Sequence, residues 1–177
     1  MITYHKKMSI LGKKFFEQPT LKVAKELLGK FLCTPKEKFM ITEVEAYDGP
    51  KDKASHAYKG KTARNTPMFG PAGVWYVYFV YGMHNMLNIV VGSKNYPAAV
   101  LLRGLLSSPR AKLDGPAKLT KFLKIDRKFN GKKAVPKNNL WIEDLGVKIK
   151  KSQIKSSPRI GVQYAGEWAK KHYRFYL

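Results

Sequence analysis

The fold of this chain is decided by two stretches, Ile41-Thr-Glu-Val-Glu-Ala-Tyr47 and Val74-Trp-Tyr-Val-Tyr-Phe-Val-Tyr81-Gly-Met83. The first alternates with a period of two, which predicts a strand with Glu43, Glu45 and Tyr47 on one face and small or apolar residues on the other. The second is apolar on both faces, which predicts a central strand covered on each side. A long loop rich in glycine and proline separates them. Acids and aromatic rings are therefore expected close together.

The flanking sequence predicts two helices and several further strands. Thr20 is expected to cap a helix that Gly29 ends, and Asp114-Gly-Pro-Ala117 opens a second helix. Strands are predicted at residues 31–34, 39–47, 86–91, 98–103, 140–142 and 173–177. We expect an α+β fold, a single domain over residues 1–177 with a curved, mainly antiparallel β-sheet flanked by helices. Residues 1–14 are expected to form a poorly ordered basic extension.

Composition points to a polyanionic partner. The chain has 177 residues, 44% of them hydrophobic, which suits one domain with a sizeable core. Its 34 Lys and Arg against 12 Asp and Glu give a formal net charge of +22, which favours nucleic acid. A lysine-rich composition unrelated to binding is the competing explanation. A membrane surface is a weaker one, because no basic amphipathic helix stands out.

The single cysteine and the apolar pattern bear on the class of protein. Cys33 cannot form an internal disulfide or a cysteine zinc site, so we expect it to be buried in an intracellular protein without a metal. No apolar run reaches the ~18 residues of a membrane span, and the N-terminal residues lack the apolar core of a secretory signal. We therefore expect a cytoplasmic protein that does not bind membranes.

Glu45 is the candidate catalytic acid or base. It precedes the turn sequence Asp48-Gly-Pro50 and shares a strand face with Tyr47. A carboxylate in that position can act as a general base on water, provided that its neighbours keep it ionised. The alternative is that Glu43 and Glu45 are solvated residues on a half-exposed face.

Aromatic residues offer surfaces on which a base can stack. These residues are Tyr47, His56, Tyr76, Tyr78 and Tyr81. The competing interpretation places Tyr76 and Tyr78 in the core and makes His56 a structural histidine. Tyr81-Gly-Met83 occupies a predicted hairpin tip, where it is either a wedge that opens base steps or a turn that folds back onto the core.

Several motifs, in order from residue 15 to 177, closely resemble the alkyladenine (3-methyladenine) DNA glycosylase family of the animal type. They are Glu43-Val-Glu-Ala-Tyr47-Asp-Gly-Pro50, Ala54-Ser-His56, Thr66-Pro-Met-Phe69, Tyr76-Val-Tyr78-Phe-Val-Tyr81-Gly-Met83, Asn88-Ile89, Val100-Leu-Leu-Arg103, Gly115-Pro-Ala-Lys118-Leu119, Pro158-Arg-Ile-Gly-Val162 and Ala165-Gly-Glu-Trp168. The resemblance implies a monofunctional DNA glycosylase of base-excision repair.

By the same resemblance, the enzyme flips a damaged purine out of duplex DNA and hydrolyses its N-glycosidic bond with an activated water, leaving an abasic site. Its substrates would be of the 3-methyladenine, 7-methylguanine, hypoxanthine and ethenoadenine class. It would need no cofactor, metal or obligate protein partner, and it would act as a monomer on double-stranded DNA, in the nucleoid if the cell is prokaryotic.

The resemblance also assigns roles to individual residues. Glu45 matches the general base that deprotonates the attacking water, and Arg103 matches an arginine that helps to hold that water. The positions that sandwich the flipped base are Tyr47, His56 and Tyr78.

Further residues match the pocket wall and the intercalating tip. Asn88 and Leu101 match the wall, and the asparagine would exclude normal guanine by a clash with its exocyclic amino group. Tyr81, with Met83 beside it, matches the side chain that fills the gap left by the flipped nucleotide.

Two departures from the family pattern concern DNA contact. His84 stands where better-known members have an aromatic residue, and residues 104–114 are shorter than the helical insertion of relatives. Two other functions stay open. A non-catalytic binder of distorted DNA would keep the wedge and the charge, and a basic RNA- or ribosome-associated protein would make Glu45 incidental.

Overall fold

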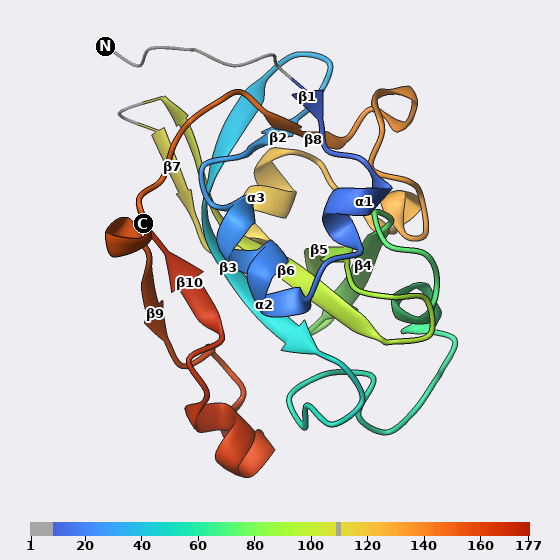
Figure 1. The fold of residues 1–177 in the computed structure, drawn as a ribbon. Helices are drawn as coiled ribbons and strands as arrows, with labels where there is room; N and C mark the ends of the chain where they lie inside the picture. The colour runs from blue at the N-terminus through green and yellow to red at the C-terminus, as the bar shows by residue number, and fades with distance from the viewer. Residues whose placement is uncertain (1–8, 109–110) are drawn as a thin grey trace.

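The computed structural model describes residues 9–108 and 111–177, which form an α+β domain built on a ten-stranded sheet (Figure 1). The strands are β1 (Ser9–Ile10), β2 (Phe31–Cys33), β3 (Lys38–Asp48), β4 (Trp75–Val80), β5 (His84–Val90), β6 (Ala98–Ser108), β7 (Ala111–Asp114), β8 (Trp141–Asp144), β9 (Lys155–Ser157) and β10 (Arg174–Tyr176). The α-helices are α1 (Lys13–Phe16), α2 (Thr20–Leu27) and α3 (Pro116–Phe122). Short 3-10 helices are η1 (Thr66–Phe69), η2 (Arg127–Phe129), η3 (Pro136–Asn138), η4 (Lys151–Gln153) and η5 (Gln163–Lys170).

The sheet is antiparallel at every pairing of these strands, which confirms the predicted fold class. Its main order is β1-β8-β2-β3-β6-β5-β4. β10 pairs with β3 and β9, and β7 pairs with β6. The strands predicted at residues 31–34 and 39–47 correspond to β2 and β3, which pair as a hairpin, and β4, β5 and β6 pair in sequence order as a meander. β3 therefore pairs with three other described strands, β2, β6 and β10.

The prediction that β4 is a central strand is wrong. β4 ends the strand order and pairs along its length with β5 alone among the described strands. Its outer edge is covered by a loop instead: Trp75 N–H donates to Lys132 O, Gly131 N–H to Trp75 O, and Val77 N–H to Asn130 Oδ1. The loop satisfies backbone groups that an edge strand would otherwise expose, so an apolar strand can lie there.

The prediction that residues 1–14 are poorly ordered can be compared with the structure only from residue 9 onward. Residues 1–8 lie outside the described part of the chain. Residues 9–14, expected to be poorly ordered, instead contribute β1, which pairs with β8, and the start of α1. Leu11 N–H donates to Ile142 O, and its side chain is buried in the core, which holds this segment in place.

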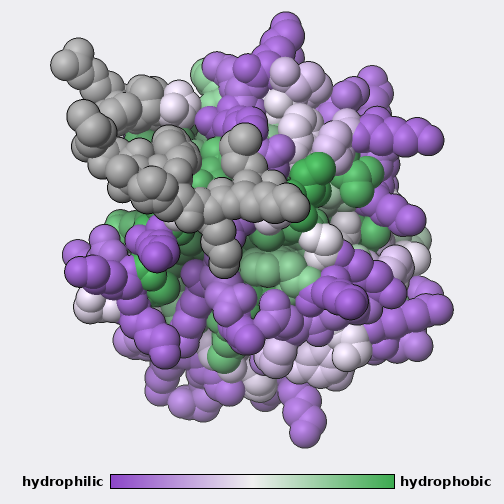
Figure 2. Space-filling model, turned by 45° about the horizontal axis from the view of Figure 1, so that its top comes forward, coloured by the Kyte–Doolittle hydropathy of each residue, from purple (hydrophilic) through white to green (hydrophobic). Residues whose placement is uncertain are grey.

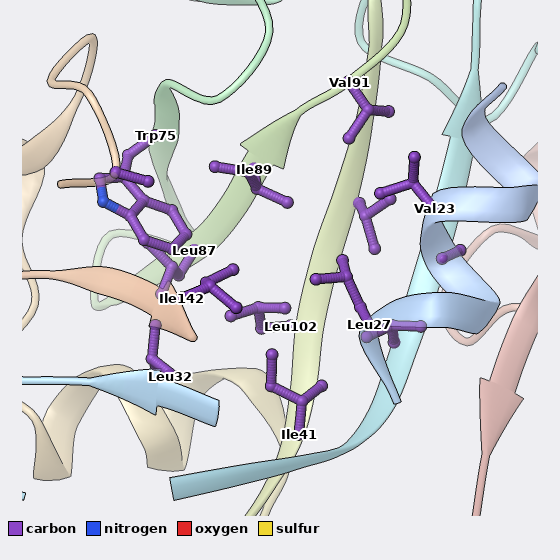
Figure 3. Close-up of a cluster of buried hydrophobic side chains, with 14 of the residues drawn as sticks. Val23, Leu27, Leu32, Ile41, Trp75, Leu87, Ile89, Val91, Leu102 and Ile142 are labelled. Atoms are coloured by element: carbon purple, nitrogen blue, oxygen red, sulfur yellow. The ribbon is translucent and has the colours of Figure 1, made fainter. Parts of the chain in front are cut away.

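Helix α2 covers the face of the sheet that carries the main core. Val23, Ala24 and Leu27 are buried at helical spacing and pack toward β3 and β6 (Figure 3). The predicted cap is wrong: Pro19 is the N-cap, and the Thr20 hydroxyl donates to Asp48 Oδ1 at 2.6 Å. Thr20 therefore ties the helix to the end of β3 instead of capping it.

A bulge in β3 faces a glycine of β6. The register between these strands shifts between Ile41 and Val44, where Glu43 pairs with Gly104. A Cβ atom at Gly104 would lie 2.8 Å from Glu43 Cβ and 2.9 Å from Thr42 Oγ1, closer than packed atoms tolerate. Bulges of this kind redirect side chains near functional sites. Gly104 therefore permits the local path of β3 that carries both glutamates.

The surface carries the chain's many charges. Figure 2 shows hydrophilic side chains over most of the face it presents, with hydrophobic groups gathered near its middle. None of the helices in the described residues is long and apolar enough to cross a membrane. Cys33 is buried, as predicted.

Candidate active site

A pocket of about 200 Å³ opens on the face of β3 opposite α2. Val44 and Ala46 point into the main core, so Glu45 between them points the other way, into the pocket. Nearly all of the predicted site residues line it: Glu45, Tyr47, His56, Tyr78, Tyr81, Asn88, Leu101 and Arg103. The volume is below the ~300 to 1000 Å³ of most small-molecule sites, which suits a single flat ring system.

Glu45 lies on the pocket floor with its carboxylate fully buried, at 0% exposure. Its Oε1 accepts a hydrogen bond from Ile160 N–H at 2.8 Å, and its Oε2 accepts one from the Tyr47 hydroxyl at 3.0 Å. Arg103 Nε lies 3.5 Å from Oε1. Burial raises the pKa of Glu45, while Arg103 and the Ile160 N–H lower it. The carboxylate is thus desolvated but oriented by donors, as a general base needs.

Glu43 is a member of the site that the sequence interpretation left aside. It is 8% exposed, and its Oε1 accepts hydrogen bonds from Arg103 Nε at 3.1 Å and Arg174 Nε at 2.8 Å. Arg103 therefore lies between Glu43 and Glu45, so this residue of β6 is close to both carboxylates of β3. The alternative of two solvated glutamates is wrong. The alternation with a period of two, which places Glu43 on the same strand face as Glu45, was the sequence pattern that could have indicated Glu43. No sequence pattern indicated Arg174.

His56, Tyr76 and Tyr78 form one wall of aromatic rings. The His56 and Tyr78 ring centroids are 4.4 Å apart, and His56 Nδ1 lies 2.9 Å from the Tyr76 hydroxyl. Burial lowers the pKa of His56 to about 4, so its imidazole is neutral at neutral pH. Burial also raises the pKa of Tyr76 to about 12. Tyr76 is buried in the core and also lines the pocket. The interpretation of this ring as a core residue and its interpretation as a stacking surface are therefore both partly right.

Asn88 and Leu101 lie opposite each other on β5 and β6 and complete the wall. The Asn88 amide nitrogen donates to Tyr76 O at 3.1 Å and to Met86 O at 3.3 Å. These bonds to the backbone fix the amide plane. The side chain can therefore act as a rigid steric stop at the pocket wall.

The β4–β5 tip projects away from the core. Tyr81 is 86% exposed and Met83 is 66% exposed, so the alternative in which they fold back onto the core is wrong. Tyr81 has a φ of 52° and Gly82 a φ of 65°, both in the left-handed region. Tyr81 lines the pocket mouth, and His84, which pairs with Val80, sits at the base of the tip.

The segment from Pro158 to Val162 closes the pocket on its other side. Ile160, Val162 and Tyr164 line it, and Arg159 is buried behind them in a salt bridge with Asp52. Residues 158–162 belong to a motif noted in the sequence, but nothing local indicated that they approach Glu45. Within the range 104–114, expected as a shortened connection, residues 104–108 at the end of β6 pair with residues 111–114 of β7.

No group of His, Cys, Asp and Glu side chains within residues 9–108 and 111–177 has an arrangement that could hold a metal ion. The polar side chains of the pocket include the carboxylate, guanidinium, phenol, amide and imidazole groups described above, together with the hydroxyl of Ser55. Such a set can bind a flat heterocycle and activate one water molecule.

Residues 14–177 match the family model described as methylpurine-DNA glycosylase (MPG). A relative from Methanocella arvoryzae is 44% identical over 96% of this chain and 92% of its own length. Relatives from Legionella pneumophila (strain Corby; 42% identity, 96% and 95% coverage) and Ehrlichia chaffeensis (40% identity, 95% and 93% coverage) are also similar. All three carry the name "putative 3-methyladenine DNA glycosylase". These relatives are archaeal and bacterial, so the animal-type part of the resemblance is not supported. With nearly its whole length matched, the chain belongs to the methylpurine-DNA glycosylase family.

Proposed function

We propose that this protein is a monofunctional DNA glycosylase that removes alkylated or deaminated purines from double-stranded DNA. The observation that carries the proposal is Glu45, a fully buried carboxylate held by Ile160 N–H, Tyr47 and Arg103 at the floor of an aromatic pocket. A net charge of +22 supplies the attraction to a polyanion. The family membership and the names of the relatives support the same activity.

The proposed reaction is hydrolysis without a covalent intermediate. Glu45 accepts a proton from a water molecule whose oxygen attacks C1′ of the deoxyribose. The bond between C1′ and the purine nitrogen breaks, and its electron pair leaves with the base. An alkylated purine is a good leaving group, so a positioned water suffices. Arg103, 3.5 Å from the carboxylate, helps to hold that water and keeps Glu45 ionised.

The flipped purine would occupy the slot between Tyr47 on one side and His56 and Tyr78 on the other. Stacking on aromatic rings contributes ~1 to 3 kcal/mol per base. The neutral imidazole of His56 can offer a hydrogen bond without repelling a cationic base. Asn88 and Leu101 limit the slot at its wall, where the fixed amide would clash with the exocyclic amino group of guanine.

The exposed tip would keep the duplex open. Tyr81 would fill the gap left by the flipped nucleotide, and Met83 would press against the neighbouring base step. Flipping costs about a few kcal/mol, less for a damaged base, and phosphate contacts from the lysine-rich surface offset it.

Base release from defined duplexes tests the proposal. Oligonucleotides with one hypoxanthine, ethenoadenine, 3-methyladenine or 7-methylguanine are incubated with the wild type, Glu45→Gln and the surface control Glu167→Gln. We expect release by the wild type and the control, and a loss of ~10²-fold or more for Glu45→Gln with lesion binding preserved. Undiminished release by Glu45→Gln would remove the assigned base. A wild type that binds lesions but releases none would favour the non-catalytic binder.

Borohydride trapping tests the absence of a covalent step. A glycosylase that uses water forms no imine with the sugar, so reduction of an active reaction mixture should yield no enzyme–DNA adduct on a denaturing gel. A known imine-forming glycosylase on its own substrate is the positive control. An adduct of this protein would overturn the water mechanism.

A further inference from the structure

Asp52 and Arg159 form a salt bridge whose side chains are both 0% exposed. Arg159 Nη1 donates to Asp52 Oδ2 at 2.6 Å, and Nη2 donates to Oδ1 at 2.8 Å, so the contact is bidentate. The proposed mechanism uses neither residue. A buried pair of this kind is weak support for stability alone, because desolvating two charges offsets much of their attraction.

The pair joins the end of β3 and the loop that follows it to the C-terminal segment, which is more than 100 positions away in sequence. Arg159 also donates to the carbonyl oxygens of Ala46, at the end of β3, and of Trp168, in η5. Asp52 accepts hydrogen bonds from the backbone N–H groups of Asp48 and Ala54. The end of β3, the loop that leads to His56 and the C-terminal segment are therefore fixed to one another at this point.

The contacts of the pair extend directly to the pocket floor. Ile160, the residue after Arg159, donates its N–H to Glu45 Oε1 at 2.8 Å. The Arg159 guanidinium lies 4.8 Å from the ring centroid of Tyr47, whose hydroxyl donates to the other carboxylate oxygen. Both neutral donors to Glu45 are thus placed by one buried guanidinium.

We propose that Asp52 and Arg159 are a positioning pair, which holds Ile160 N–H and the Tyr47 ring against Glu45 and thereby sets the orientation and ionisation of the base. This inference rests on the proposed function for its kinetic consequence, but the ionisation of Glu45 can be measured without turnover.

Charged and titratable groups reach Glu45 from several elements. They are Arg103 on β6, Tyr47 on β3, Tyr78 on β4 and Arg159 before η5, with Glu43 and Arg174 paired beyond Arg103. Arg103 and Arg159 both lower the pKa of Glu45 against the effect of burial. Arg103 is held by Glu43, whereas Arg159 is held by Asp52, so the two cations can be varied separately.

The kinetic test compares Arg159→Lys with Arg127→Lys, the same exchange at an exposed arginine outside the pocket. Lysine keeps the charge but cannot bridge Asp52, Ala46 and Trp168 together. With folding verified by thermal melting, we expect kcat for base release at neutral pH to fall at least ~10-fold, with KM changed less than ~2-fold. The acidic limb of the kcat profile should move up by ~1 pH unit. Arg127→Lys should match the wild type.

Asp52→Asn is the second variant, and it should lower kcat as Arg159→Lys does, because Arg159 loses its bidentate partner. Folded variants at both positions with the kcat and acidic limb of the wild type would overturn the proposal.

Carboxyl NMR of ¹³C-labelled glutamate, with Glu45 assigned through Glu45→Gln, gives a readout independent of catalysis. We expect the Glu45 titration midpoint to be higher in Arg159→Lys than in the wild type. Equal midpoints would overturn the positioning role even if the enzyme is active. A raised midpoint in a protein that releases no base would leave the positioning pair standing and refute the proposed function.

Discussion

The floor of the pocket and the tip of the β4–β5 hairpin are built in opposite ways. Glu45 on the floor has no exposed surface and is held by donors from β3, β6 and the C-terminal segment. Tyr81 on the tip is 86% exposed and depends only on the local backbone of its own turn. The position of Glu45 is thus sensitive to changes far away in the sequence, whereas the tip can be altered with little effect on the fold.

The largest expected difference concerns stability. Asp52→Ala leaves the Arg159 guanidinium buried without its counter-charge, so we expect the free energy of unfolding to fall by ~3 to 5 kcal/mol. Glu167→Ala, which breaks the exposed Lys170 pair, should change it by less than ~0.5 kcal/mol. Urea unfolding followed by circular dichroism measures both. A loss below ~1 kcal/mol for Asp52→Ala would show that the floor is less tightly coupled than the hydrogen bonds indicate.

Gly104→Ala should disturb the pocket floor, because the added methyl group would press on the bulge of β3. The added Cβ would meet Glu43 Cβ at 2.8 Å, and we expect a destabilisation of ~1 to 3 kcal/mol with reduced base release. Gly12→Ala is the matched control, because Gly12 has no atom within 4 Å of an added Cβ and a φ of −92°. Thermal unfolding and single-turnover release report on the two effects. Equal stability of both variants would mean that β3 can shift to accept the methyl group.

The pH dependence of base release should sharpen the contrast further. In the proposed mechanism Glu45 works as the carboxylate. Burial raises its pKa above the usual 4.5, so the rate should begin to fall at a higher pH than the one at which an ordinary glutamate becomes protonated. Well below that pKa, each pH unit should lower kcat tenfold, or about 1.4 kcal/mol. His56, with its pKa lowered to about 4, is still mostly neutral at the pH where Glu45 begins to become protonated. An acidic limb centred at or below pH 4.5 would argue against Glu45 as the base.

The smallest effect on the fold is expected at the tip. Tyr81 holds a left-handed backbone, which costs a non-glycine residue ~1 to 2 kcal/mol, so Tyr81→Gly should raise the free energy of unfolding by about 1 kcal/mol. Tyr81→Ala loses the same ring without that relief.

Both tip variants should weaken binding to lesion-containing duplex more than to single strands, as measured by fluorescence anisotropy, and Tyr81→Phe should bind as the wild type. Equal losses on duplex and single strand would remove the wedge role.

Features that depend on residues close together in the sequence could be predicted, whereas features that depend on contacts between distant residues could not. The β2–β3 hairpin, the meander and the shared face of Glu43 and Glu45 depend on neighbouring residues, and alternation reveals them. The edge position of β4 could not be predicted, because residues 130–133 provide the partner groups that replace a strand.

Two charge contacts of the site were equally hidden from the sequence. Arg159 and Asp52 are separated by 107 positions, and Arg174 and Glu43 by 131. No local sequence pattern predicts a contact between residues so far apart in the chain. The motif at residues 158–162 could be recognised in the sequence, but the contact of its Ile160 N–H with Glu45 could not be predicted.

The attachment of the C-terminal segment to β3 has a consequence for biosynthesis. A ribosome-bound chain that has not yet emerged beyond Pro158 already carries Glu45 and the tip, but lacks both Ile160 N–H and Arg174. In the proposed enzyme, the complete set of contacts around Glu45 and Glu43 would therefore form only once translation has delivered β10.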